Sequence, residues 1–166
     1  IPSKINASLS YGDKPNKEQT QHVIADMLTA NGFLEIWCNS LTKAAYSKNI
    51  VEAVKILNPL SSDLNVMRQS LLMPALESVA YNQNRKNPDI KFYEFGKTYH
   101  LINDKYVERP RLLLILSGAR QAEQWNHQRT AVNFYHIKAA VDAVISRLGV
   151  ANYQSEEISN ADFAYG

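Results

Sequence analysis

The sequence lacks several features that mark well-known classes of protein. Its single cysteine, Cys38, excludes an internal disulfide and gives no metal-ligand spacing. The longest apolar run, residues 112–116, is far too short to cross a bilayer. No basic segment followed by an apolar one opens the chain, so we expect no secretion, no membrane contact and a reducing, cytoplasmic location. The apolar neighbours Ile36 and Trp37 favour a buried, unreactive thiol at Cys38.

Familiar catalytic patterns are missing as well. No glycine-rich phosphate loop is present, because the six glycines are scattered over positions 12, 32, 96, 118, 149 and 166. There is no Gly-X-Ser-X-Gly nucleophile motif. No histidine pair has metal-binding spacing among His22, His100, His127 and His136. The sequence therefore predicts no metal and no cofactor in this segment.

The charge is weak and dispersed. The formal net charge is +2, and the basic residues do not gather in one stretch. Arg109 with Arg111, or Arg85 with Lys86, could each touch a phosphate, but scattered basic residues more often form a solvated face. The 166 residues, 45% of them hydrophobic and 20% charged, suit one globular domain.

The pattern along the chain predicts a mixed architecture. Residues 1–15, with two prolines and a glycine, are typical of an entering linker, and residues 16–166 are expected to form a core module that is truncated at its C-terminus. Asn16 is a candidate N-cap for a helix over 17–31, with Gln19 three positions on and Gly32 after its end. Further helices are predicted at 41–47, 74–84 and 132–148. The second should turn Leu76, Val79 and Ala80 inward, and the third carries an apolar stripe of Ile137, Ala140, Val141, Val144, Ile145 and Leu148. Alternating or apolar β-formers predict strands at 33–41, 51–57, 90–102 and 106–118.

Local signals connect these elements. Asn103-Asp104 is a plausible hairpin turn between the two long strands. Ser62 or Asp63 can cap a helical segment whose apolar positions are 64, 67, 71 and 72, and Pro74 should interrupt it and open the next helix. We therefore expect a short turn, a step and then a full helix. Residues 121–130 are predicted to be a loop, and a further strand could begin after 150. The fold class expected is α+β, an antiparallel sheet flanked by helices.

Arg68 and Glu94 attract attention as charged residues in apolar surroundings. The Arg68 guanidinium must find acceptors, which could be backbone carbonyls, Asp63, a ligand or a partner. Glu94 shares a strand face with Phe92 and could pair with Arg68 or Arg85. Asn84 and Arg85, at the end of a helix, can satisfy its last carbonyls and favour its dipole.

Three runs in this region carry a family resemblance. They are residues 58–72, NPLSSDLNVMRQSLL; residues 76–85, LESVAYNQNR; and residues 92–99, FYEFGKTY. They resemble the β subunit of bacterial phenylalanyl-tRNA synthetase, and weaker matches at 31–36, NGFLEI, and 134–138, FYHIK, lie in the expected order. The resemblance covers about residues 17–149, and its central run is long and specific.

The resemblance implies the fold of the class II synthetases, in the catalytic-like module of the β subunit. It implies an enzyme of two α and two β subunits that uses ATP and magnesium to join phenylalanine to its tRNA. Residues 17–41 resemble class II motif 1, which makes subunit interfaces, although its proline is missing near Ser40-Leu41. Residues 91–99 resemble motif 2.

The departures from the family's catalytic pattern suggest the role of this segment. Motif 2 of active class II enzymes runs Phe-Arg-X-Glu, and its arginine clamps the α-phosphate of ATP. Glu94 matches the glutamate, but Phe92 occupies the position of the arginine. A phenyl ring has no charge and no donor to stabilise a phosphoryl transition state. Motif 3, a glycine-rich strand and helix ending in Glu-Arg, is absent from the sequence.

We therefore expect a non-catalytic module that scaffolds the catalytic α subunit, with tRNA bound by the holoenzyme. Two alternatives remain open, an active ATP-dependent ligase domain and a tRNA-binding module. The residues expected at the subunit interface are His22, Val23, Met27 and Leu28. Those expected to form the structural motif are Asn58, Pro59, Arg68, Asn84, Arg85, Glu94 and Gly96.

Overall fold

The computed structural model describes residue 8 and residues 16–121, 124–126 and 128–158. The linker expected at 1–15 falls almost entirely outside these residues. The strand expected after 150 is not formed over 151–158, and the remainder of that segment lies outside the described residues. Among the described helices, none combines the length and the apolar character that crossing a membrane would require.

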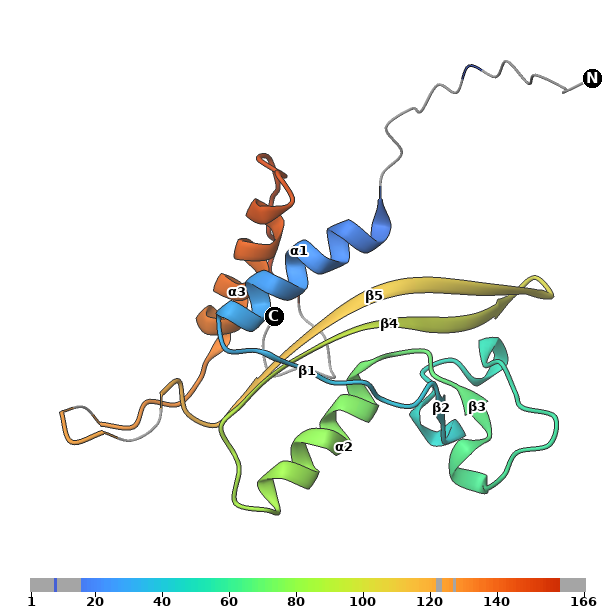
Figure 1. Cartoon of the computed structure of the whole chain (residues 1–166). Helices are drawn as coiled ribbons and strands as arrows, with labels where there is room; N and C mark the ends of the chain where they lie inside the picture. The colour runs from blue at the N-terminus through green and yellow to red at the C-terminus, as the bar shows by residue number, and fades with distance from the viewer. Residues whose placement is uncertain (1–7, 9–15, 122–123, 127, 159–166) are drawn as a thin grey trace, which may run out of the picture.

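A three-stranded sheet forms the centre of the fold, with the strand order β1-β4-β5 (Figure 1). The long strands β4 (Ile90–Ile102) and β5 (Lys105–Ser117) pair antiparallel along their whole length, as expected. The short strand β1 (Leu34–Glu35) pairs with β4 in parallel, which the sequence did not indicate. The α+β fold class is confirmed.

The helices divide between the two faces of this sheet (Figure 1). Helices α1 (Lys17–Ala30) and α3 (Phe134–Arg147) lie on one face. Helix α2 (Leu72–Gln83) lies on the other, beside a two-stranded sheet of β2 (Leu41–Thr42) and β3 (Val66–Met67). The central sheet therefore has helices on both faces, while the hairpin end of β4 and β5 extends beyond α1 and α3 (Figure 1).

The turn between β4 and β5 is the one that the sequence predicted. Asn103 and Asp104 both have positive φ, at 49° and 59°. Two consecutive left-handed residues match the right-handed twist of a hairpin, and asparagine and aspartate tolerate this conformation better than most residues. The turn thereby fixes the register in which Ile102 faces Lys105.

Helix α1 begins and ends at the predicted signals. The side chain of Asn16 accepts hydrogen bonds from the backbone N–H groups of Glu18 and Gln19 at 3.1 and 3.2 Å. At the other end Gly32 has a φ of +81°, and the N–H of Phe33 reaches back to the carbonyl of Leu28 at 3.0 Å. This is the bonding of a Schellman cap, which brings Leu28 and Phe33 together in the core.

Two apolar cores follow from the alternation of side chains along β4 and β5. The residues under α1 and α3 include Tyr93 and Phe95 of β4 with Leu112, Leu114 and Leu116 of β5; they pack against Ile24, Leu28, Phe33 and Val144. The second core lies under α2, and it joins Val79 to Ile90 and Phe92. The two opposite faces of β4 therefore contribute to different cores.

Between residues 36 and 71 the structure corrects most of the sequence expectations. The strand expected at 33–41 is confined to β1, and the helix at 41–47 is β2 followed by a 3-10 turn, Ala44–Tyr46. The strand expected at 51–57 is wrong, because a 3-10 turn, Ile50–Glu52, and a single bridge at Lys55 replace it. The short turn expected after the cap at Ser62 or Asp63 is formed as a 3-10 turn, Ser62–Leu64, and the step before the full helix contains β3.

Asparagine side chains explain much of this irregularity. Asn39 accepts from the N–H of Leu41 at 2.9 Å, and Asn49 accepts from the N–H of Val51 at 3.1 Å. Asn65 does the same for a residue far along the chain, the N–H of Ala44, at 2.9 Å. Such bonds offer the backbone a local alternative to a helix or a strand ladder.

The two later helices exist as expected, but their buried faces are narrower. Pro74 lies in the first turn of α2, where its missing N–H costs little. Ala75 and Val79 are buried there, whereas the expected inward residues Leu76 and Ala80 are exposed. In α3 the cap of Asn133 and His136 is formed, and only one residue of the expected apolar stripe is fully buried, Val144.

Gly118 tests how tightly the end of the hairpin packs. Its φ is +80°, and an added Cβ would collide with Asp89 Oδ1 and the backbone of Pro88. We expect Gly118→Ala to lower the free energy of unfolding by about 3 kcal/mol, from left-handed strain and overpacking together. The control is Gly149→Ala, where φ is +75° and no atom lies within 4 Å, so about 1 kcal/mol of strain should remain. Urea denaturation measures both, and equal losses would contradict the packing argument.

Candidate functional site

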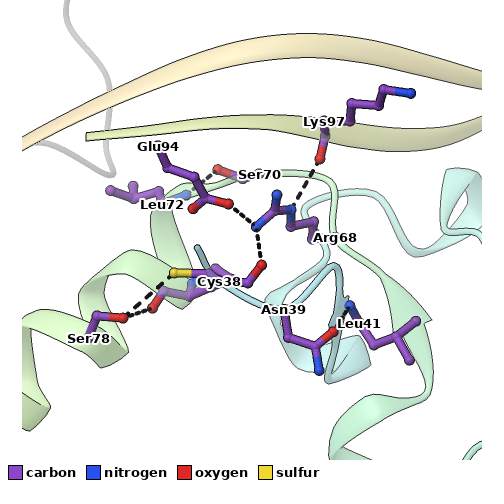
Figure 2. Close-up of polar contacts among 10 residues, drawn as sticks. Cys38, Asn39, Leu41, Arg68, Ser70, Leu72, Ser78, Glu94 and Lys97 are labelled. Atoms are coloured by element: carbon purple, nitrogen blue, oxygen red, sulfur yellow. Dashed lines mark hydrogen bonds and ion pairs between the residues drawn. The ribbon is translucent and has the colours of Figure 1, made fainter. Parts of the chain in front are cut away.

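Arg68 and Glu94 form a buried ion pair under the sheet (Figure 2). Arg68 Nη1 lies 2.7 Å from Glu94 Oε1. Arg68 is 2% exposed and Glu94 is fully buried. Of the two partners considered for Glu94, the structure selects Arg68. The two opposite charges neutralise each other where water does not reach them.

The guanidinium of Arg68 also binds the backbone of two other segments. Its Nε donates to the carbonyl of Lys97 at 3.1 Å, and its Nη1 donates to the carbonyl of Cys38 at 3.2 Å. The main chain of Arg68 bonds to Ser40 at 2.9 Å and to Tyr99 at 3.0 Å. One side chain therefore joins β4, the segment that follows β1 and the segment that follows β3. No side-chain pattern in the sequence could have identified the two carbonyls as its acceptors.

Gly96 makes room for this guanidinium. A Cβ at position 96 would lie 2.5 Å from Arg68 Nη2 and 2.7 Å from Leu71 Cδ2. Real Cβ atoms do not approach other heavy atoms so closely, so a larger residue would displace Arg68 or Leu71. The glycine is needed for the space that it leaves, since its φ is not in the left-handed region.

Cys38 lies beside the pair and is half-buried (Figure 2). Its Sγ is 3.6 Å from Ser78 Oγ. Burial raises the pKa of the Cys38 thiol, the hydrogen bond with Ser78 opposes the rise, and the nearby Glu94 carboxylate adds to it. The thiol therefore stays protonated at neutral pH, in keeping with the unreactive cysteine that the sequence predicted.

Phe92 belongs to the apolar core beneath α2. It is 8% exposed and packs with Val79 and Ile90. It also lines a cleft of about 720 Å³ between α2 and the segment that follows β1. Lys43 is the one cation among the described residues that line this cleft; it lies 3.6 Å from Glu77 and 4.5 Å from the centre of the Tyr46 ring.

The remaining residues of the predicted structural motif lie elsewhere. Asn58 and Pro59 are in an exposed loop. Asn84 is the C-cap of α2, and Arg85 donates to the carbonyl of Tyr81 at 3.2 Å and stacks 3.3 Å from the centre of its ring. The structure thus brings together Arg68, Glu94 and Gly96 and separates the other four. Among the described side chains, no cluster could hold a metal ion.

The interface residues expected on α1 differ in their availability. His22 is exposed, and Val23 and Met27 are half-buried. Leu28 is 1% exposed and lies in the module's own core. We therefore leave Leu28 out of any proposed interface.

Comparison with known proteins identifies the family. The family model described as the phenylalanyl-tRNA synthetase beta chain CLM domain matches residues 1–166. The chain belongs to this family. The resemblance carried by residues 58–72 and the two following runs is confirmed.

Relatives of this CLM domain are much longer proteins. The phenylalanine–tRNA ligase beta subunit of Bacteroides thetaiotaomicron is 41% identical over 165 residues, which cover 90% of this chain and 20% of that protein. The same subunit of Bacteroides fragilis is 42% identical over 168 residues, again 90% of this chain and 20% of that protein. The chain spans about a fifth of the length of these relatives.

Solved structures similar to this CLM domain show the class II fold. An ATP phosphoribosyltransferase regulatory subunit/histidyl-tRNA synthetase from Bacillus halodurans superposes with a TM-score of 0.63 at 16% identity, over 91% of this chain and 40% of that one. A pyrrolysyl-tRNA synthetase from Desulfitobacterium hafniense gives 0.57 at 12% identity, over 89% and 50%. The class II synthetase-like architecture is confirmed.

The buried ion pair gives a direct test of its structural role. We expect Arg68→Met to lower the free energy of unfolding by about 3–5 kcal/mol, because it leaves the Glu94 carboxylate buried without a countercharge. The double variant Arg68→Met with Glu94→Leu should recover most of that loss, since no charge then remains inside. Urea denaturation measures the single and double variants.

The matched control is the ion pair of Lys97 and Glu108 on the same hairpin, which is 2.6 Å long and about half exposed. Lys97→Met should hardly move the denaturation midpoint, because solvent already screens this pair. A double variant at 68 and 94 that is as unstable as Arg68→Met alone would show that charge neutralisation is not what the pair contributes.

Proposed function

We propose that this CLM domain carries no catalytic site and scaffolds the catalytic α subunit of a phenylalanine–tRNA ligase. The observation that carries the proposal is Phe92, a buried phenyl ring at the position where the class II pattern has its ATP-binding arginine. A phenyl ring at this position has no charge and no donor with which to stabilise the charge that develops on a transferred phosphoryl group.

The other cations near β4 do not replace the missing arginine. Arg68 is 2% exposed, its charge is paired with Glu94, and its Nε and Nη1 are held by two backbone carbonyls, so it is not accessible to a phosphate. Lys43 in the adjoining cleft lies beside Glu77. Asp63 and Glu77 also line that cleft and would repel a triphosphate. These features favour the scaffold over the alternative of an active ATP-dependent ligase domain.

The wider proposal concerns the assembly. The domain would belong to a cytoplasmic enzyme of two α and two β subunits, in which ATP, magnesium and phenylalanine bind to the α subunit and tRNA binds to the holoenzyme. The family membership and the names of the relatives support this assignment. Val23 and Met27 on α1, half-buried in the isolated domain, and the exposed His22 would contact the α subunit.

The absence of a nucleotide site can be tested on the full-length β chain. We expect no saturable binding of ATP in the presence of magnesium and phenylalanine, because Phe92 offers the α-phosphate no charge and the nearby Arg68 and Lys43 lie beside carboxylates of the domain. Equilibrium dialysis with labelled ATP measures this, and the complex with the α subunit serves as the positive control. Saturable binding to the β chain that is lost in Glu94→Gln would place an active nucleotide site here and overturn the proposal.

The proposed interface on α1 can be tested by assembly. We expect Val23→Asp with Met27→Asp in the β chain to abolish co-purification with the α subunit, because two unpaired carboxylates would be buried at the contact. Tyr106→Asp, at a residue 77% exposed near the hairpin turn, is the control and should assemble normally. Circular dichroism verifies that the variants are folded. Normal assembly of the α1 variant would exclude this face of α1 from the interface.

A further inference from the structure

A second cleft lies between α1 and α3, on the face of the sheet opposite to Arg68 and Glu94. Its volume is about 310 Å³. Met27 and Phe33 line one side, Leu116 lies at the sheet, and Ala140 and Ala143 line the side formed by α3. The cleft exists because α3 presents small alanine side chains where larger ones would have filled the space between the helices.

The surroundings of this cleft are cationic. Lys91 and Arg120 both line it, and Lys91 Nζ lies close to Gly32 at the C-terminal end of α1. Within the part of the chain that the structure describes, neither cation forms an ion pair with a carboxylate. The nearby carboxylate of Asp89 is already engaged, by the N–H of Ala119 and the guanidinium of Arg129, each at 2.7 Å.

His136 adds a hydrogen-bond donor to the same cleft. Its Nδ1 accepts from the N–H of Asn133 at 3.0 Å as part of the cap of α3. An Nδ1 that acts as an acceptor places the proton of the neutral ring on Nε2, which is then a donor. The cleft therefore combines apolar walls with two cations and one further donor, a combination complementary to an apolar group that has anionic groups beside it.

We infer that this cleft receives a large apolar side chain of the α subunit, and that carboxylates flanking that side chain pair with Lys91 and Arg120. This rests on the proposed function, because it takes the α subunit as the partner. Met27 belongs both to the proposed α1 interface and to the cleft, so the two surfaces are continuous. A second copy of this domain fits less well, since it would bring the same two cations against themselves.

A photo-cross-linker at the cleft identifies the occupant in the assembled enzyme. Ala143 is exposed in the domain and lines the cleft, so we choose the substitution Ala143→p-benzoylphenylalanine in the full-length β chain, co-expressed with the α subunit. We expect an α–β cross-link whose site on the α subunit lies next to aspartate or glutamate. A cross-link within the β chain, a β–β cross-link, or no cross-link would overturn the inference.

Charge reversal tests the two cations. We expect Lys91→Glu with Arg120→Glu to weaken the association of α and β subunits at least tenfold at low salt, and the neutral pair Lys91→Gln with Arg120→Gln to weaken it less and to flatten its dependence on salt. Mass photometry over a dilution series measures the association. Lys86→Glu with Lys105→Glu, which makes the same change in charge at exposed residues outside the cleft, should leave it within twofold.

The outcomes separate this inference from the proposed function. Thermal melting of the free β chains verifies that each variant is folded. If Lys91→Glu with Arg120→Glu proves unstable, the test relies on Lys91→Gln with Arg120→Gln. Wild-type association of both cleft variants would overturn the inference, and if Val23→Asp with Met27→Asp still abolished assembly the scaffold would stand. An equal loss in the control pair would also overturn it, because the effect would then be one of overall charge.

Discussion

The pairing of Arg68 with Glu94 is the constraint on which the irregular half of the domain depends. Neither charge could remain inside the protein alone, so each fixes the position of the other. Through the carbonyls of Cys38 and Lys97, the same guanidinium holds the chain after β1 against β4. Gly96 is required because the guanidinium occupies the place of a side chain. The buried guanidinium of Arg68 thereby fixes the conformation of a region that has few helices or strands.

The same strand face shows how a ligand-binding position can become part of a core. Phe92 and Glu94 point to one side of β4, where the class II pattern has an arginine and a glutamate. A solvated arginine would keep that face open to a phosphate, whereas the phenyl ring packs with Val79 and Ile90 and closes the core under α2. Once the face is dry, the carboxylate needs a fixed countercharge, which Arg68 supplies. The buried phenyl ring and the buried ion pair are thus linked, because the dry surroundings that Phe92 helps to make are the reason that Glu94 needs Arg68.

The parts of the fold that depend on contacts between neighbouring residues could be predicted from the sequence, and the parts that depend on contacts between distant residues could not. Asn16, Gly32 and Asn103-Asp104 act on residues next to them, so the bounds of α1 and the hairpin turn could be read from the sequence. The segment from 36 to 71 could not, because some of its backbone N–H groups bond to asparagine side chains, as Ala44 does to Asn65, and others bond to carbonyls distant in the sequence, as Arg68 does to Ser40. At the site, the charges of Arg68 and Glu94 allowed an ion pair to be predicted. The two backbone carbonyls that Arg68 binds could not be predicted, because every residue has such a carbonyl.

The face of the sheet under α2 and the face under α1 and α3 differ in how their polar groups are paired. Under α2 the buried pair of Arg68 and Glu94, with the two backbone carbonyls that Arg68 binds, ties segments of the domain to one another. Under α1 and α3 the alanines of α3 leave an apolar cleft, and Lys91 and Arg120 beside it have no carboxylate partner among the described residues. A domain that spans about a fifth of its relatives' length would use such a face for contact, because burying it against a complementary acidic and apolar surface removes both kinds of exposed group from water.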